Sequence, residues 1–404
     1  MSMINADRDS APSARVADAR SPFVRLAELL ADINPGKPAI NLSVGEPQHP
    51  IPSFVGPTLA AHLAEFGRYP AGKGTESFRR AAAGWLGRRY RLKRPVDPEN
   101  EIIVLSGTRE GLFLAAIAAK RWVGPRAGTP AILIPNPFYA VYSAAALAAE
   151  CEPVYLAATA AHAFLPDLDL LDDALLSRAV AFYLASPANP QGAVANQAYL
   201  SRLAGLARRH GFLVFTDECY SEIYSEHAPP GMLEAACPDF ANAVVFHSLS
   251  KRSSLPGLRV GFAAGDRRFI GKFLDLRNVS SAQVPEPAQA VAVVAYADET
   301  HVEENRRLYA AKFDLADQII GDRYAYRRPP GGFFLWLDVG AVGGGEQASL
   351  RLWREAGLRV LPGRFIARDQ ADGSNPGADY IRVALVQDKE ATAEALHRLV
   401  AVLG

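Results

Sequence analysis

The sequence is poor in cysteine and has no excess of either charge. Its 404 residues include three cysteines, Cys151, Cys219 and Cys237, without CxxC spacing. An odd number without paired spacing argues against a disulfide framework or a thiolate metal site, and it indicates free thiols in a reducing compartment. Lys plus Arg and Asp plus Glu both number 43, so no overall field attracts the chain to nucleic acid or to a membrane surface.

The sequence also lacks long apolar segments and clustered histidines. The alanine-rich segment 140–163 is interrupted by charged residues and a proline, so it cannot span a membrane. Residues 1–20 have no apolar core of the kind a signal peptide needs, and their aspartates argue against a transit peptide. We therefore expect a cytoplasmic protein with an N-terminal arm at 1–20 and no metal site.

What the sequence does contain is a regular alternation of short apolar runs and helical patterns between residues 100 and 265. Continuous apolar runs are typical of strands that are buried on both faces. The pattern predicts an α/β fold with a mostly parallel sheet. The expected strands are 102–105, 131–134, 153–156, 180–184, 212–215, 243–246 and 260–263, and the expected helices are 108–123, 139–149, 195–209 and 220–224.

The pattern of apolar and polar residues changes after Pro287. Long amphipathic helices are expected at 286–298 and 301–319, and shorter elements follow them. We predict a smaller α+β domain formed by residues 21–45 and 290–404, and a large domain formed by residues 46–289. The small domain should begin with a helix capped by Ser21, and it should include strands at 333–338 and 380–385 and helices at 346–356 and 389–402.

The segment Ser248–Gly261 carries the strongest chemical signal. Lys251 lies shortly after the apolar run 243–246, and Arg259 follows it between two glycines. Glycines let the backbone and the guanidinium approach a ligand closely. A lysine can form an imine with an aldehyde, and an arginine can clamp a phosphate. Both demands together point to pyridoxal 5'-phosphate.

Two further motifs follow predicted strands. The turn Gly107-Thr108-Arg109 opens a helix, where free N–H groups and the helix dipole favour an anion; a plain turn capped by Thr108 is the alternative. Asp217 closes another strand, where α/β folds place ligands. It could hold the proton on a pyridine nitrogen, or it could simply cap a helix.

Three other side chains stand at similar positions. Tyr139 could stack on a flat heterocycle, or it could pack in the core at a helix start. Asn189 could donate its amide to a phenolate oxygen, although Asn-Pro before a glycine also makes a turn. Tyr220 could reach the hydroxyl group of the same ring. The sequence leaves the cis or trans state of Asn189–Pro190 open.

Arg382 lies within the apolar strand Tyr380–Leu385. A charge among apolar neighbours is costly unless it meets an anion. The alternatives are a structural salt bridge and a bidentate clamp on the carboxylate of a substrate.

Taken in order, these motifs resemble those of the fold-type I, class I/II aminotransferases, from about Ser21 to the C-terminus. The resemblance implies pyridoxal 5'-phosphate as cofactor, amino and oxo acids as substrates, and a homodimer with shared active sites. It implies Lys251 as the imine lysine, Asp217 as the partner of the pyridine nitrogen, and Arg382 as the α-carboxylate anchor beside Gly45. The implied phosphate and ring contacts are Gly107, Thr108, Arg109, Tyr139, Asn189, Tyr220, Ser248, Arg259 and, from the neighbouring subunit, Tyr69.

Within that family, several sequence segments are similar to those of bacterial N-succinyldiaminopimelate aminotransferases. The segments that carry this likeness are 42–50, 248–262, 361–365 and 375–385. Gln191 stands where relatives often have threonine. The resemblance implies amino transfer between N-succinyl-LL-2,6-diaminopimelate and 2-oxoglutarate or glutamate, and no spacing selects a residue for the distal group of the substrate.

Other activities remain open on the sequence. They are an aspartate, alanine or aromatic aminotransferase, a pyridoxal-phosphate-dependent C–S lyase, and a ligand-sensing domain of a transcription regulator. The last needs an attached DNA-binding domain, which the short N-terminal arm cannot hold.

Overall fold

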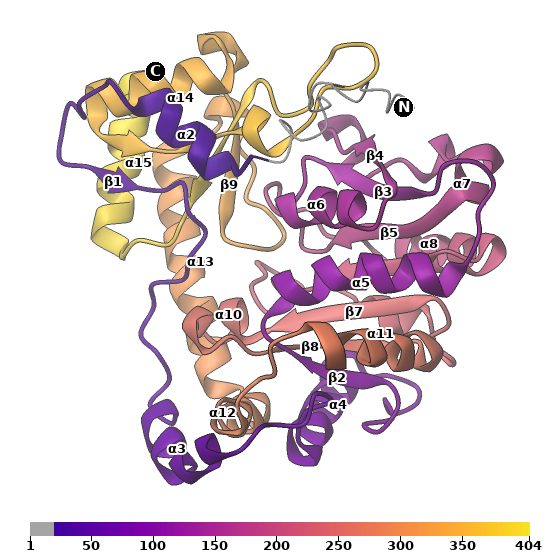
Figure 1. Cartoon of the computed structure of the whole chain (residues 1–404). Coiled ribbons are helices and arrows are strands. Elements are labelled where there is room, and N and C mark those ends of the chain that lie inside the picture. Colours follow the sequence, from indigo (N-terminus) through magenta and orange to yellow (C-terminus); the bar gives the residue numbers. More distant parts are fainter. Residues whose placement is uncertain (1–19) are drawn as a thin grey trace, which may run out of the picture.

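The structure, a computed structural model, describes residues 20–404. The predicted N-terminal arm therefore lies, apart from Arg20, outside the described residues. Figure 1 shows a large sheet with helices on both faces and a smaller sheet beside it. The two regions are joined by the long helix α13 (Thr300–Ile320).

The large sheet has seven strands in the order β2-β8-β7-β6-β5-β3-β4. The two pairings that involve β8 are antiparallel, and all the other pairings are parallel. The predicted α/β fold with a mostly parallel sheet is confirmed. The strands are β2 (Ile102–Leu105), β3 (Ala131–Asn136), β4 (Glu152–Ala157), β5 (Ala179–Ala185), β6 (Leu213–Asp217), β7 (Ala243–Ser248) and β8 (Gly261–Gly265).

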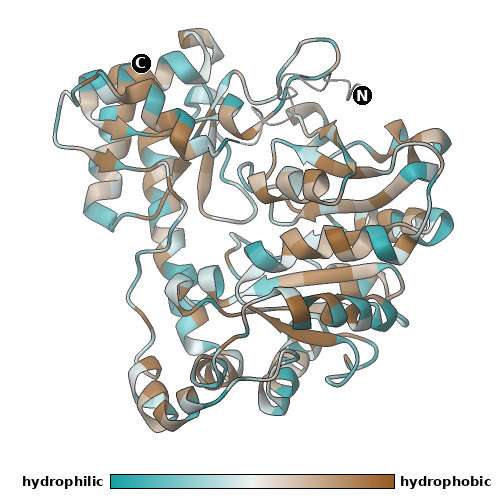
Figure 2. Ribbon diagram, viewed as in Figure 1, coloured by the Kyte–Doolittle hydropathy of each residue, from teal (hydrophilic) through white to brown (hydrophobic). Residues whose placement is uncertain are grey.

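Side chains of the large sheet alternate between two hydrophobic cores. In β2, Ile102 and Val104 join one core, whereas Ile103 and Leu105 join the other. Because helices cover both faces, the strands are apolar throughout, and Figure 2 shows them mostly brown. One face carries α5 (Thr108–Val123), α6 (Ala140–Ala148) and α11 (Arg267–Ser280), and the other α4 (Glu76–Tyr90), α7 (Asp173–Arg178), α8 (Gln197–His210), α9 (Met232–Ala235) and α12 (Glu286–Ala297).

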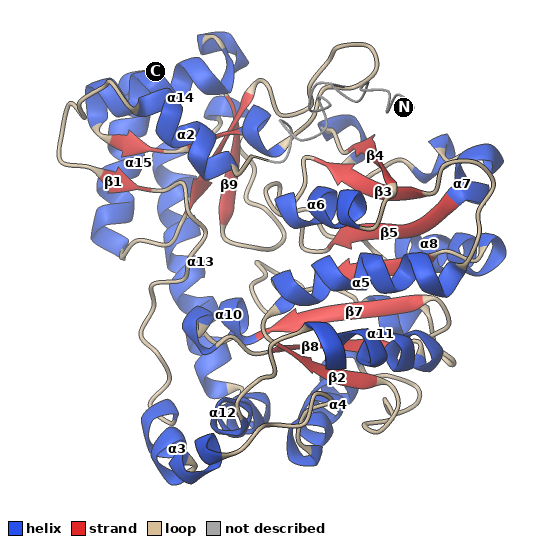
Figure 3. Cartoon of the chain, viewed as in Figure 1, coloured by secondary structure: helices blue, strands red, loops and turns tan. Residues whose placement is uncertain are grey.

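The smaller region is built on the antiparallel sheet β11-β12-β9. A separate parallel pair, β1 with β10, lies beside it (Figure 3). Ser21 caps the first helix, as predicted, because its hydroxyl oxygen accepts a hydrogen bond from the Phe23 backbone. The elements are α2 (Pro22–Leu30), β1 (Ile40–Asn41), β9 (Phe334–Asp338), α14 (Gly344–Ala356), β10 (Leu358–Arg359), β11 (Leu361–Pro362), β12 (Tyr380–Ala384) and α15 (Lys389–Leu403). Helix α3 (Val55–Ala61) instead packs against α12 of the large region, and Val55 joins the core there. The predicted domain boundaries at 45/46 and 289/290 stay a prediction.

The predicted helix at 220–224 is wrong. Residues 219–222 form a turn, and Tyr224 makes an isolated antiparallel bridge to Gly331. The Ser225 N–H donates to the Pro330 carbonyl oxygen at 3.0 Å. Backbone hydrogen bonds to a distant loop therefore replace those that a local helix would have formed. The three cysteines are free thiols, as the sequence predicted.

Candidate active site

The candidate site lies at the carboxyl ends of three adjacent strands. β6 ends at Asp217, the Ser186–Asn189 loop follows β5, and β7 leads directly into the short helix α10 (Leu249–Arg252). Because these strands are parallel neighbours, their ends meet at one edge of the sheet. The fold thereby brings Asn189 close to Asp217, 28 residues later in the chain, and to Lys251, a further 34 residues later.

Lys251 extends from α10 across to the N-terminal segment. Its Nζ donates a hydrogen bond to the Gly45 carbonyl oxygen, and it lies 5.4 Å from the centroid of the Phe333 ring. Burial lowers the pKa of Lys251 to about 8. The uncharged form, which a nucleophile requires, is therefore far more populated near neutral pH than in an ordinary lysine, although the protonated form still predominates. Ser248 caps α10 by accepting from the Ser250 N–H at 3.1 Å.

Asp217 is a buried carboxylate held by two donors. The Tyr142 hydroxyl donates to Oδ2 at 3.0 Å, and the Cys219 backbone N–H donates to Oδ1 at 3.3 Å. Burial raises the pKa of Asp217, and these hydrogen bonds oppose the rise. Since the segment after Asp217 is a turn, the alternative that Asp217 caps a helix is wrong.

Arg382 is 4% exposed, and it lies over the Phe334 ring with its Cζ 4.5 Å from the centroid. One Nη donates to Asn189 Oδ1 at 3.0 Å and the other to the Ser43 carbonyl oxygen. Its Nε has no hydrogen-bond partner. Burial lowers the pKa of Arg382 to about 10. Within residues 20–404 no carboxylate pairs with it, so the structural salt bridge left open by the sequence is wrong.

Arg259 lies against the start of α5. A Cβ built on Gly107 would lie 2.2 Å from Arg259 Nη2, and Gly107 has a φ of +80°. The backbone conformation therefore favours glycine at this position, whereas the end of the Arg259 side chain could move aside for a Cβ. Gly107, rather than Thr108, occupies the cap position, and no side chain caps the helix. Thr108 Oγ1 instead lies 3.2 Å from Cys219 Sγ. An arginine beside an uncapped helix N-terminus is a suitable setting for a phosphate.

The remaining predicted residues fall into two groups. Tyr139 begins α6, and its hydroxyl accepts from Arg109 Nε at 2.6 Å. Tyr220 packs edge-on against Phe333, with ring centroids 5.3 Å apart. By contrast, Tyr69 is 96% exposed and stands apart from the other predicted side chains. Its predicted contact requires a second copy of the chain.

The sequence reasoning missed residues that shape this site. A Cβ on Gly45 would lie 2.6 Å from the Phe334 ring, so Phe334 sets how closely the Gly45 backbone approaches. Tyr142, the donor to Asp217, lies three residues after Tyr139 and thus on the next turn of the same helix. Helical spacing alone could have identified Tyr142, whereas nothing local connects Phe334 with Gly45.

Comparison with known proteins agrees with this arrangement. Residues 37–399 match the family model for class I and II aminotransferases. The chain belongs to the class I and II aminotransferase family. Enzymes of this family depend on pyridoxal 5'-phosphate and act on small amino and oxo acids.

Similar aminotransferases cover nearly the whole chain. The LL-diaminopimelate aminotransferase of Desulforudis audaxviator is 30% identical over 388 residues, 95% of each chain. An aminotransferase structure from Neisseria meningitidis has 37% identity and a TM-score of 0.89, covering 95% of this chain and 98% of that one. A probable N-succinyldiaminopimelate aminotransferase from Thermus thermophilus has 25% identity and a TM-score of 0.83, covering 95% and 100%. Among the described helices of this aminotransferase, none has the length and apolarity needed to cross a membrane.

Proposed function

We propose that this aminotransferase binds pyridoxal 5'-phosphate through Lys251 and transfers an amino group between N-succinyl-LL-2,6-diaminopimelate and 2-oxoglutarate or glutamate. The buried, unpaired Arg382 is the observation that carries the proposal. Such a guanidinium is costly to bury unless a ligand anion pairs with it. An α-carboxylate accepts two parallel N–H bonds from an arginine, so an amino or oxo acid is the expected ligand.

The residues present suit the cofactor. Arg259, Ser248 and the start of α5 offer donors to a phosphate, and Gly107 leaves room for it. Asp217, held in place by Tyr142, would face the pyridine nitrogen and favour its protonated form. Asn189 and Tyr220 would contact the ring hydroxyl, and Tyr139 would cover the ring. When bound, the cofactor supplies an aldehyde that accepts the amino group and a ring that withdraws electrons.

The chain itself supplies orientation and proton transfer. Arg382 would fix the α-carboxylate so that the α-hydrogen faces Lys251. The Lys251 amine would act as the general base that takes up that hydrogen as a proton. A pKa of about 8 is close to the operating pH, which is the condition for efficient proton transfer.

The choice of amino donor rests on likeness. The segments 42–50 and 375–385 resemble those of N-succinyldiaminopimelate aminotransferases, and the Thermus thermophilus structure supports this choice. Curated relatives named LL-diaminopimelate aminotransferase favour a second candidate, the donor without the succinyl group. The two donors share the α-carboxylate that Arg382 would bind, and they differ only at the distal end.

A half-reaction assay tests both the proposed amino transfer and the proposed amino donor. The full-length protein loaded with pyridoxal 5'-phosphate is mixed with one donor at a time, and the absorbance of the bound cofactor is followed. We expect N-succinyl-LL-2,6-diaminopimelate to convert the cofactor to its aminated form faster than LL-diaminopimelate, aspartate, alanine or phenylalanine does. A faster conversion by LL-diaminopimelate would replace the first donor with the second. Conversion by none of them would contradict the proposed function.

We also propose that the active unit is a homodimer, as the resemblance to the family implies. Large apolar side chains close to Tyr69 in sequence are also exposed, and they include Leu63 at 60% and Phe66 at 57%. An isolated monomer would leave this group in water. Analytical ultracentrifugation should find a dimer, and a monomer with full activity would contradict this proposal.

A further inference from the structure

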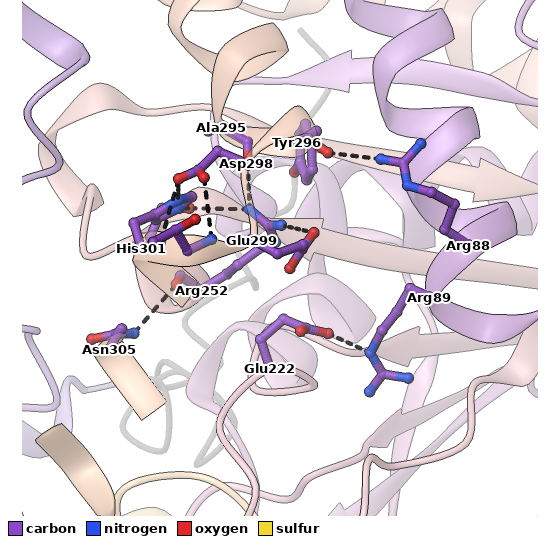
Figure 4. A network of polar contacts seen from close by, with 12 residues as sticks. Arg88, Arg89, Glu222, Arg252, Ala295, Tyr296, Asp298, Glu299, His301 and Asn305 are labelled. Atoms are coloured by element: carbon purple, nitrogen blue, oxygen red, sulfur yellow. Dashed lines mark hydrogen bonds and ion pairs between the residues drawn. The ribbon is translucent and has the colours of Figure 1, made fainter. Parts of the chain in front are cut away.

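The helix that carries Lys251 is too short to fix its own position. α10 has four residues, so contacts with other elements must hold it. Figure 4 shows Arg252 pointing toward Ala295 and Glu299, at the junction of α12 and α13. There Arg252 donates to the Ala295 carbonyl oxygen at 2.7 Å and to Glu299 Oε1 at 2.6 Å. The junction therefore anchors α10 from behind.

Asn305, on α13, makes contacts at the end of α10 through all of its amide atoms. Its Nδ2 donates to the backbone carbonyl oxygens of Lys251 at 3.0 Å and of Arg252 at 3.2 Å. Its Oδ1 lies 3.1 Å from the Ser254 hydroxyl and 2.7 Å from His49 Nδ1. Asn305 is only 6% exposed, so its hydrogen bonds face little competition from water.

The partners of Asn305 determine the state of His49. Two carbonyl oxygens can only accept, so the amide nitrogen must face them and Oδ1 must face His49. His49 Nδ1 therefore carries a proton. Its Nε2 lies 2.8 Å from the Nζ of the buried Lys312, which can only donate when charged. His49 is thus neutral, and burial lowers its pKa in agreement with this state.

His49 belongs to the same segment as Gly45, whose carbonyl oxygen accepts the Lys251 Nζ hydrogen bond. Asn305 therefore contacts both sides of that interaction. One side is the backbone of Lys251, and the other is the segment that carries the acceptor. Lys312, which also donates to the Leu385 carbonyl oxygen at 3.2 Å, fixes His49 from its far side.

We propose that Asn305 is a positioning residue that, together with His49, holds the Lys251 backbone in register with the Gly45 carbonyl and keeps the amine out of water. The inference rests on the proposed role of Lys251 as the reacting amine. Asn305 does not touch the amine itself. Its effect on Lys251 passes through the backbone at both ends of the contact.

The proposal predicts a change in the titration of Lys251. Besides burial, the charged and titratable groups that act on this amine are Cys219, Arg382, Glu46 and Asp217. They come from the end of β6 and the turn after it, from β12 and from the Gly45 segment, and a variant at position 305 leaves all of them present. Loss of the register would admit water, and weaker desolvation raises the pKa of an amine toward its usual value.

The test is competitive labelling of the full-length chain, freed of pyridoxal 5'-phosphate so that the Lys251 amine is free, with acetic anhydride at a series of pH values, with Lys251 followed by peptide mass spectrometry. The wild type should reach half of its maximal reactivity near pH 8. Asn305→Ala should shift this midpoint upward by about one pH unit. Arg307→Ala removes an exposed side chain from the same helix and should leave the midpoint unchanged.

Two outcomes would overturn the proposal. One is a folded Asn305→Ala variant, checked by circular dichroism, with the wild-type midpoint. If that variant does not fold, His49→Ala takes its place, and a wild-type midpoint there counts equally against the proposal. His49→Gln, which keeps one donor and one acceptor, should restore the midpoint in part. Covalent uptake of pyridoxal 5'-phosphate is measured in parallel on the wild type, and its absence would contradict the proposed function while leaving the labelling result intact.

Discussion

Cations on the two sides of helix α10 differ in their ion pairs. The rear side faces the junction of α12 and α13, and the other side faces the candidate site. On the rear side, Arg252 pairs with Glu299 at 2.6 Å, and nearby Arg89 pairs with Glu222 at 2.5 Å. On the side of the candidate site, Lys251 and the buried Arg382 form no ion pair with any carboxylate in the part of the chain that the structure describes, and neither does the exposed Arg259. The rear charges stabilise the fold, whereas the charges of the candidate site would, under the proposed function, be available to the phosphate and carboxylate of ligands.

The rear side also shows that geometry alone does not make a catalytic site. His301 Nδ1 lies 2.6 Å from Asp298 Oδ2, and His301 Nε2 lies 2.8 Å from Ser253 Oγ. This order of groups is that of a hydrolase triad. Ser253 is 1% exposed, however, so no substrate can reach it. The chain of hydrogen bonds serves to hold the segment after α10 in place.

The largest effect should come from removing the Lys251 amine. Lys251→Ala eliminates both the covalent attachment point and the general base, so we expect turnover to fall by more than about 10³-fold. Steady-state assays with the donor identified in the half-reaction would measure it. Lys272→Ala, a change at an exposed lysine of α11, serves as the control. Transamination that survives in Lys251→Ala would contradict the assignment.

The next largest effect should come from removing the Arg382 guanidinium. Arg382→Met should lower kcat/KM by about 10²–10³-fold, because a buried two-pronged contact with the carboxylate is lost. Most of this loss should appear in KM. Arg354→Met, at an exposed position, should behave as the wild type does. If Arg382→Met kept its kcat/KM, the proposed carboxylate anchor would have to be sought elsewhere.

The free energy of unfolding should fall more when Arg252 is replaced than when Arg382 is replaced, which reverses the order expected for activity. Arg252→Met leaves Glu299 and the Ala295 carbonyl without their donor. Because Glu299 is partly exposed and water can solvate it, we expect the free energy of unfolding to fall by about 2 kcal/mol. Arg382→Met should lower it by less than about 1 kcal/mol, because relief from burying an unpaired charge offsets two lost hydrogen bonds. Urea denaturation of both full-length variants would measure the difference. Equal losses would show that the distinction between the two sides is wrong.

The smallest effect is a pH dependence on the rear side. Burial raises the pKa of Asp298, but hydrogen bonds from His301 and Thr300 outweigh it, and the pKa falls to about 2. A lowered pKa stabilises the folded state above the usual value of 3.8, and this stabilisation is lost as pH falls toward 2. With solvent screening it amounts to about 1 kcal/mol. Asp298→Asn should lack this acid-dependent loss in urea denaturation; an unchanged pH profile would count against it.

The sequence predicted the large sheet well because its strands are apolar on both faces. β2 and α5 begin and end where the sequence placed them, since apolar runs and Gly-containing turns mark those boundaries. Lys251, Asp217 and Arg382 were also identified, because polar side chains within or beside apolar strands are conspicuous.

Contacts between distant segments could not be read in the same way. His49 and Asn305 lie 256 residues apart in the chain, and no local periodicity connects them. The helix expected at 220–224 failed for a similar reason, because the Tyr224–Gly331 bridge is a tertiary contact. Local pattern thus predicted the candidate reacting residues, whereas the contacts made by Asn305 and His49 could be seen only in the fold.

The most direct test of the contrast between the two sides is to locate the bound cofactor. The full-length protein is incubated with pyridoxal 5'-phosphate, reduced with borohydride and digested, and the modified peptide is identified by mass spectrometry. The proposed function predicts a phosphopyridoxyl group on Lys251. A modification confined to another lysine, or no modification at all, would contradict it.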